Sequence, residues 1–123
     1  MTDGSLAPRL RDLHEVRIRT ESKGGAPHRT TIWVVVDERD RILVRSYRGA
    51  GARWYREARS GRPVALEVNG ELHAVSVEPA TDAERVAACS RGFEAKYAGD
   101  PAARAMVADE VLDTTLELTP VRP

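Results

Sequence analysis

The sequence contains a single cysteine, Cys89, and no long apolar run. One cysteine cannot close an intramolecular disulfide, and no segment reaches the length of a membrane-spanning helix or of a signal-peptide core. We therefore expect a cytoplasmic protein with no membrane partner. Lysine is also scarce, with Lys23 and Lys96 the only two, so arginine supplies most of the positive charge.

Neither sign of charge is in excess, because 19 basic residues balance 19 acidic ones and the formal net charge is zero. The charges are scattered along the chain rather than gathered in one stretch. A protein that binds duplex nucleic acid needs a basic patch, so we do not expect nucleic acid as a partner. We therefore expect the partner of this protein to be a small molecule.

The residues that build common catalytic and metal sites show no recognised spacing. Three histidines, one cysteine and scattered carboxylates lack the spacing of a zinc site, and no calcium-binding loop, P-loop, dinucleotide-binding motif or nucleophile elbow is present. We predict no metal and assign no catalytic residue. His28 lies in an expected loop, where a solvated histidine is the ordinary case, and a catalytic His28 is kept as the lesser alternative.

Six segments have the alternating or β-branched pattern of strands. They are expected at residues 14–20, 31–36, 42–44, 64–68, 72–77 and 114–119. Residues 22–27, SKGGAP, are expected to form a loop, because Pro27 and the glycines before it do not fit a central strand. Asn69 and Gly70 predict a tight hairpin turn. Since most connections are too short for parallel crossovers, the expected fold is a small, mainly antiparallel barrel.

Three or four short helices complete the predicted fold, which is mainly β with flanking helices in one domain over residues 1–123. The helices are expected near residues 6–13, over 53–60, from 81 to 99, and after Pro101. Thr81 followed three residues later by Glu84 predicts a capping box at the start of the third helix. Gly99 is expected to end that helix.

The stretch of residues 30–58 is the part of the chain most typical of a ligand site. A hydroxyl, guanidinium groups and flexible backbone amides come close to the start of a helix, and this combination favours binding of a phosphate. The residues that provide these groups are Arg45, Ser46, Arg48, Gly49 and Arg53. A solvated basic loop is the alternative interpretation.

Groups that suit a planar ring lie in the same stretch. Thr30 and Thr31 precede the first buried strand, where exposed backbone amides can meet the polar edge of a ring. Trp54 follows the basic loop and can cover the apolar body of a ligand. Filling the core is the default role of Trp33 and Trp54, and this role remains the alternative.

Residues 29–58, RTTIWVVVDERDRILVRSYRGAGARWYREA, resemble the core of the split-barrel flavin-binding superfamily. This superfamily includes pyridoxamine-phosphate-oxidase-like proteins and deazaflavin-dependent nitroreductases, and the chain looks closest to a group of short, uncharacterised bacterial members. In the deazaflavin-dependent reductases a strand ends in a serine or lysine-glycine loop, and a tryptophan-tyrosine pair opens the next helix; SYRG and RWY match these features. The resemblance covers most of the chain and implies a six-stranded antiparallel split β-barrel.

The resemblance also implies a homodimer that holds a flavin-type cofactor in a groove between its subunits. The cofactor would be FMN or a deazaflavin coenzyme of the F-420 type, and the implied activity is hydride transfer to or from a small organic substrate. The residues expected near the phosphate are Ser46, Arg48, Arg53 and Trp54, and those expected along the ring are Thr31, Ile32 and Trp33.

Two positions depart from the reductase pattern. Arg53 and Glu57 stand where the reductases usually have a proline and an asparagine. A carboxylate at Glu57 that pointed inward would repel a phosphate, so the choice of cofactor stays open. Two alternatives stay open as well. One is a split-barrel protein that binds a small molecule without redox activity; the other is a cofactor-free enzyme that uses the same groove, with Glu57 or His28 as the first residues to mutate.

Overall fold

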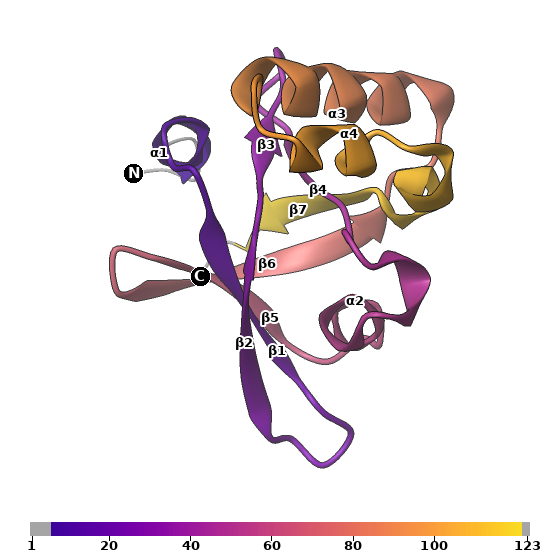
Figure 1. The fold of residues 1–123 in the computed structure, drawn as a ribbon. Coiled ribbons are helices and arrows are strands. Elements are labelled where there is room, and N and C mark those ends of the chain that lie inside the picture. Colours follow the sequence, from indigo (N-terminus) through magenta and orange to yellow (C-terminus); the bar gives the residue numbers. More distant parts are fainter. Residues whose placement is uncertain (1–5, 122–123) are drawn as a thin grey trace.

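The structure is a computed structural model that describes residues 6–121 (Figure 1). Seven strands form one curled antiparallel sheet in the order β2-β1-β5-β6-β7-β4-β3. Their bounds are β1 (Val16–Glu21), β2 (Pro27–Ile32), β3 (Val35–Val36), β4 (Ile42–Val44), β5 (Val64–Val68), β6 (Glu71–Pro79) and β7 (Leu116–Pro120). The curled sheet with short helices around it confirms the predicted fold class, a mainly β split barrel with flanking helices.

The sheet has seven strands rather than the expected six, because the strand predicted over 31–36 is two strands. The first of them, β2, begins at Pro27 and pairs with β1 from Val16↔Ile32 to Glu21↔Pro27. The prediction that Pro27 belongs to a loop was therefore wrong. Proline is tolerated here because it is the first residue of a strand at the edge of the sheet, where a backbone N–H is not required.

Asn69 and Gly70 form the predicted turn between β5 and β6. Both have a positive φ, 53° and 82°, as a primed two-residue turn requires. The register places Val68 opposite Glu71, directly across the turn.

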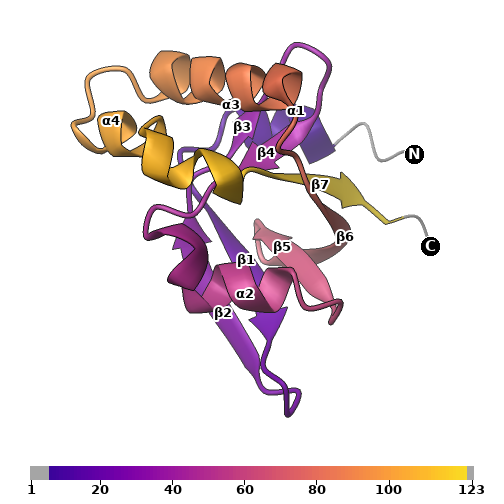
Figure 2. The same ribbon diagram turned by 90° about the vertical axis from the view of Figure 1, so that its right-hand side faces the viewer.

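Within residues 6–121, four α-helices and two 3-10 helices flank the sheet. They are α1 (Leu6–Arg11), α2 (Arg53–Ala58), α3 (Ala83–Lys96), α4 (Ala102–Met106), η2 (Gly49–Gly51) and η3 (Asp109–Thr114). Figures 1 and 2 show α3 and α4 together at the end of the sheet that contains β3 and β4, whereas α2 lies at the opposite end, beside β1 and β2. The sheet therefore carries its helices in two separate groups.

The start of α3 differs from the predicted capping box. Asp82, not Thr81, is the N-cap, and its carboxylate accepts a hydrogen bond of 3.0 Å from the backbone N–H of Arg85. Glu84 turns away from the helix start and binds Arg41. Aspartate at the position directly before the helix is as good a cap as threonine one residue earlier, so it sets the boundary.

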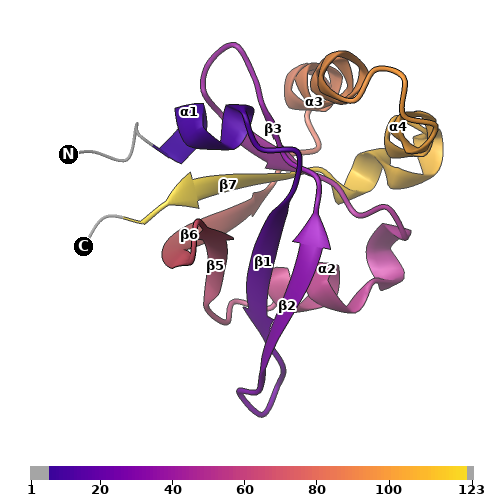
Figure 3. The same ribbon diagram turned by 60° about the vertical axis from the view of Figure 1, so that its left-hand side comes forward.

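The apolar side chains form two cores, one on each face of the sheet. The first includes Ile18 and Leu66. The second includes Phe93 of α3 and Met106 of α4, two helices that lie side by side in Figure 3. Within β4, Ile42 belongs to the first core and Leu43 to the second. The strand is thus covered on both faces, as its unbroken apolar run predicts.

Candidate functional site

A cleft of about 520 Å³ opens beside the start of α2. Its walls come from the end of β2, the loop from β4 to η2, the first turn of α2, and α4. The lining residues are Glu15, Thr30, Thr31, Ile32, Trp33, Arg45, Tyr47, Arg48, Ala52, Arg53, Trp54, Ala102 and Met106. Small-molecule sites commonly have volumes of roughly 300–1,000 Å³, so the cleft is large enough for one.

Most of the residues predicted to bind a ligand meet at this cleft. Those that line it are Thr30, Thr31, Ile32, Trp33, Arg45, Arg48, Arg53 and Trp54. The other two, Ser46 and Gly49, are not part of the lining. The structure thus brings the segment predicted along the ring and the segment predicted around the phosphate to one place, while binding itself stays a prediction.

Ser46 supports the turn that follows β4. Its side chain is buried, its hydroxyl donates to the carbonyl of Gly49 at 2.6 Å, and its backbone N–H donates to the Thr114 hydroxyl at 3.0 Å. Gly49 has a φ of 82°, a conformation that glycine adopts without strain. Both residues therefore shape the loop that presents Arg48, instead of lining the cleft.

Arg45 is a buried guanidinium that holds several elements together beneath the cleft. Its Nε donates to the Thr115 hydroxyl at 2.8 Å, and Nη1 donates to the Ser90 hydroxyl at 2.9 Å and to the Met106 carbonyl at 3.0 Å. Nη2 donates to the Val86 carbonyl at 2.8 Å. Burial lowers the pKa of Arg45. Since its donors are largely occupied, Arg45 serves the cleft mainly as a support.

Arg48 and Arg53 are the cations that the cleft leaves free. Both are exposed, and neither side chain makes a hydrogen bond or an ion pair with another residue in the described range 6–121. Glu15 is the acidic residue among the lining residues. The cleft therefore has an excess of positive charge close to the start of α2, which favours an anionic group there.

Glu57 does not point into the cleft. Its carboxylate is buried and accepts hydrogen bonds from the Thr20 hydroxyl at 2.8 Å and from Nδ1 of His28 at 3.1 Å. Burial raises the pKa of Glu57, but the hydrogen bonds from His28 and Thr20 outweigh it and the net pKa lies below the usual value. The carboxylate is ionised at neutral pH and faces β1 and β2, so it does not lie among the residues that line the cleft.

Trp33 forms part of the cleft wall and is fixed from behind. It stacks on Tyr97 with ring centroids 3.8 Å apart and an angle of 2° between the planes. The Tyr97 hydroxyl in turn donates to the backbone carbonyl of His14 at 2.6 Å. The tryptophan is thus a rigid surface against which a planar ligand can pack.

Several residues at the cleft had no place in the predicted site. Tyr47 could have been included from its position inside the basic loop. Ala102 and Met106 lie on α4, more than forty residues from the loop in sequence, and Tyr97 acts from behind Trp33. No local pattern signals these positions, because only the packing of α3 and α4 on β3 and β4 brings them near.

Two general properties of the described residues bear on the site. Within residues 6–121, no group of three or more histidine, cysteine, aspartate or glutamate side chains is arranged to hold a metal ion. No helix in the same range has the length and apolar character needed to cross a membrane.

Residues 7–118 match DUF2255, a family of uncharacterized proteins conserved in bacteria. The chain belongs to the DUF2255 family. The match covers most of the sequence and includes every residue that lines the cleft. No curated protein is significantly similar to this DUF2255 chain.

Solved structures similar to this DUF2255 chain share its fold at low sequence identity. The conserved hypothetical protein Rv2991 from Mycobacterium tuberculosis is 16% identical with a TM-score of 0.66, over 99% of this chain and 80% of that one. The heme storage protein HutZ from Vibrio cholerae is 10% identical with a TM-score of 0.67, over 97% and 89%. An FAD and heme binding protein from Mycobacterium smegmatis is 17% identical with a TM-score of 0.54, over 95% and 64%. At these identities the similarity shows the fold alone.

Proposed function

We propose that the cleft binds a flavin-type cofactor, FMN or a deazaflavin coenzyme of the F-420 type, and that the protein is an oxidoreductase. The observation that carries the proposal is the pair of free guanidinium groups, Arg48 and Arg53, at one cleft with the stacked Trp33. A cofactor with a phosphate tail and a planar ring has the complementary shape and charge. The bound ring would supply hydride transfer to or from a small organic substrate.

The residues present fit the two ends of such a cofactor. Arg48 and Arg53 would hold the phosphate by charge-assisted hydrogen bonds. Thr30, Thr31 and Trp33 would lie along the ring. Glu57, the residue whose charge weighed against a phosphate, is engaged with Thr20 and His28 and is not part of the lining. Its carboxylate therefore does not oppose the assignment.

The similar structures support a flavin-type or related cofactor, but they do not favour FMN over the deazaflavin coenzyme. Two of them are described as a heme storage protein and as an FAD and heme binding protein. Heme iron is commonly held by histidine or cysteine, and no residue of either type lines the cleft, where Tyr47 and Met106 are the nearest substitutes. The lining thus favours a flavin-type ligand over heme.

Titration of the purified protein with FMN, and separately with the deazaflavin coenzyme, tests the proposal through tryptophan fluorescence. Binding at micromolar concentration is expected to quench the emission, since Trp33 and Trp54 line the cleft. Replacing Arg48 or Arg53 with alanine is expected to weaken FMN binding by about 1–3 kcal/mol, or roughly 5- to 150-fold. Riboflavin, which lacks the phosphate, should be affected by neither change.

Arg56→Ala is the matched control, because Arg56 is exposed on α2 and is not part of the cleft lining. Its FMN affinity should equal that of the wild type. Failure to bind either cofactor at micromolar concentration would refute the proposal. Binding without oxidation or reduction of either cofactor would favour the alternative, a protein that binds a small molecule without redox chemistry.

We also propose that the protein acts as a cytoplasmic homodimer. The strand β2, which contributes Thr30 to Ile32 to the cleft, lies at the edge of the sheet, so a second copy can approach the open side of the site. Light scattering on the samples used for the titrations gives the mass in solution. A monomer at micromolar concentration that still binds the cofactor would contradict a site shared between subunits.

A further inference from the structure

Glu15 is the acidic residue in the lining of the cleft, and the proposed function gives it no part. It is exposed, and within residues 6–121 its carboxylate makes no hydrogen bond and no ion pair. It does not pair with Arg48 or Arg53, although both cations line the same cleft. A carboxylate can only accept hydrogen bonds, so this one is available to a donor group on a ligand.

The register of the sheet places Glu15 beside Trp33. Strands β1 and β2 lie side by side in Figure 3, and Val16↔Ile32 is the last pair of their ladder. Glu15 is the residue before Val16 and Trp33 is the residue after Ile32, so the two leave the strands next to each other. The ring of His14, the neighbour of Glu15, lies edge-on to the Trp33 ring with centroids 5.7 Å apart.

The charge of Glu15 also reaches the tyrosine that stacks behind Trp33. Burial raises the pKa of Tyr97 to about 12; the hydrogen bond with the backbone of Val34 opposes this rise, and the charge of Glu15 adds to it. The negative charge of the cleft is therefore at the end formed by the Trp33–Tyr97 stack, whereas its free cations are close to the start of α2. A ligand that spans the cleft meets groups of opposite character at its two ends.

Thr31 provides a donor on the same face as this acceptor. It lines the cleft, and its hydroxyl has no hydrogen-bond partner within residues 6–121. The register pairs Thr31 with Arg17, two residues after Glu15, so Thr31 and Glu15 lie on one face of the two strands. Arg17 itself pairs with Glu67 at 3.2 Å and not with Glu15. This part of the wall thus offers a carboxylate acceptor and a hydroxyl donor together.

We propose that Glu15 accepts a hydrogen bond from the imide N–H of the cofactor ring and that the Thr31 hydroxyl donates to a carbonyl group beside that N–H. This inference rests on the proposed function. The rings of FMN and of the deazaflavin coenzyme both carry one N–H between two carbonyl groups, so either cofactor fits. The polar edge of the ring then lies at the start of β1, while the phosphate lies at Arg48 and Arg53. Heme, whose pyrrole nitrogens hold the iron, has no such donor.

Methylation of the imide nitrogen tests the contact with Glu15. The analogue 3-methyl-FMN keeps the phosphate and the planar ring but has no N–H at this position. In the fluorescence titration, the wild type is expected to bind it at least about tenfold more weakly than FMN, because a hydrogen bond to a charged acceptor is lost. Equal affinity for the two ligands would overturn the proposal and leave the cofactor site standing. If only the deazaflavin coenzyme binds, the same comparison is made with that coenzyme and its analogue methylated at the same nitrogen.

Glu15→Ala completes the comparison. It is expected to bind FMN about tenfold more weakly than the wild type, and to bind 3-methyl-FMN and FMN equally within about twofold, since the acceptor is gone. Glu110→Ala is the matched control, because Glu110 is exposed on η3 and is not part of the cleft lining. It should distinguish the two ligands as the wild type does. Discrimination that persisted in Glu15→Ala would assign the acceptor to another group.

Thr31→Val tests the donor, because valine keeps the branched shape of the side chain and lacks the hydroxyl. It is expected to weaken FMN binding about three- to tenfold. Thr119→Val is the control, at an exposed position of β7 that does not line the cleft, and its affinity should equal that of the wild type. Unchanged affinity in Thr31→Val would overturn the contact with Thr31.

Nuclear magnetic resonance of FMN labelled with nitrogen-15 at the imide position gives a readout independent of affinity. With the protein saturated, the imide proton is expected to be protected from exchange with water in the wild type and unprotected in Glu15→Ala. An unprotected proton in the wild type, or equal protection in the variant, would overturn Glu15 as the acceptor. Failure of the wild type to bind either cofactor would remove this proposal together with the proposed function.

Discussion

At the scale of single residues, Arg45 shows how one side chain can organise a site without offering itself to a ligand. The sequence places it in a basic loop, and its position there gives no sign that the guanidinium turns inward. In the structure it is 1% exposed and donates to groups on α3, α4 and the segment before β7. The planar guanidinium suits this position because each of its buried partners needs an N–H donor in a fixed direction.

Arg45→Lys is expected to lower the free energy of unfolding by more than about 2 kcal/mol. Lysine keeps the charge, but its single ammonium group cannot reach the Thr115 hydroxyl and the Val86 carbonyl together, and each buried polar group left unpaired costs about 1–3 kcal/mol. Urea unfolding followed by circular dichroism measures the change. Arg56→Lys, at an exposed position, should stay within about 0.5 kcal/mol of the wild type. Equal stability of the two variants would show that the guanidinium geometry is not required.

Glu57 marks the limit of sequence reasoning at this scale. A glutamate at this position could repel a phosphate, but only if its side chain points into the cleft. The direction of the side chain depends on where β1 and β2 lie relative to α2. Thr20 and His28 supply that partner surface from segments 37 and 29 residues away. No pattern local to the helix contains this information.

At the scale of elements, the sequence predicted what is local and missed what depends on partners. The turn at Asn69 and Gly70 follows from backbone conformations that few residues adopt, and both residues have a positive φ in the structure. Gly99 has a positive φ as well, but α3 already ends at Lys96, so the helix end predicted at Gly99 was wrong by three residues.

The break between β2 and β3 carries no comparable signal, because Trp33 and Val34 are good strand residues. After Ile32 the backbone stops pairing with β1, and from Val35 it pairs with β4. This change of partner depends on the curl of the whole sheet.

The packing of α3 on β3 depends on the absence of a side chain at Gly92. A β-carbon at this position would lie 3.0 Å from Cβ of Val35 and 3.2 Å from its Cγ2. The Val35 Cβ is fixed to the backbone and cannot rotate away, so the helix itself would have to shift. Gly92 therefore allows α3 to approach the strand closely and to bury Phe93 in the second core.

Gly92→Ala is expected to destabilise the protein although alanine favours helix. The gain in helix propensity is about 1 kcal/mol, whereas overpacking of a well-packed site costs typically 1–3 kcal/mol, so we expect a net loss of roughly 1 kcal/mol. The readout is the free energy of unfolding in urea. In the double variant Gly92→Ala with Val35→Ala, the loss should be smaller than the sum of the two single losses by at least about 0.5 kcal/mol. Strict additivity would show that the two methyl groups of Val35, which alanine removes, do not contribute to the overpacking.

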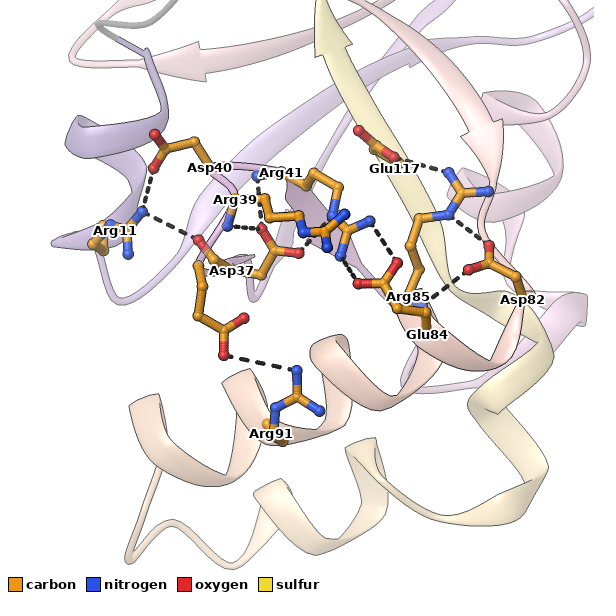
Figure 4. Close-up of polar contacts among 11 residues, drawn as sticks. Arg11, Asp37, Arg39, Asp40, Arg41, Asp82, Glu84, Arg85, Arg91 and Glu117 are labelled. Atoms are coloured by element: carbon orange, nitrogen blue, oxygen red, sulfur yellow. Dashed lines mark hydrogen bonds and ion pairs between the residues drawn. The ribbon is translucent and has the colours of Figure 1, made fainter.

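At the scale of the whole molecule, ion pairs join the turn between β3 and β4 to distant elements (Figure 4). Arg11 of α1 contacts Asp40, and Arg41 links Asp37 to Glu84 of α3. Most of these pairs are at least partly exposed, where a pair contributes at most about 1 kcal/mol. Asp37 is the exception, since its side chain is 1% exposed.

Asp37 closes the turn through both of its oxygens. Oδ1 accepts from the backbone N–H groups of Arg39 at 3.0 Å and Arg41 at 2.9 Å, and Oδ2 accepts from Nε of Arg41 at 2.6 Å. Burial raises the pKa of Asp37, but these hydrogen bonds and the charge of Arg41 outweigh it and the net pKa lies below the usual value of 3.8. The ionised form is therefore the one that the folded protein stabilises.

Asp37 should make the stability of the protein depend on pH in the acid range. Because the pKa of Asp37 is lower in the folded than in the unfolded state, the contribution of its carboxylate to stability is complete above the unfolded pKa. That contribution is lost as the pH falls through the folded pKa.

Asp37→Asn is thus expected to lower the free energy of unfolding by about 1–3 kcal/mol at pH 7. Its difference from the wild type should shrink as the pH falls below 3.8. Thermal unfolding followed by circular dichroism across this range measures both effects. Asp40→Asn in the same turn is the matched control. Asparagine tolerates the positive φ of 61° at this position, and the exposed carboxylate of Asp40 pairs only with Arg11 among the residues that the structure describes. A wild-type advantage over Asp37→Asn that stayed constant from neutral to acid pH would show that the carboxylate acts through its shape and not through its charge.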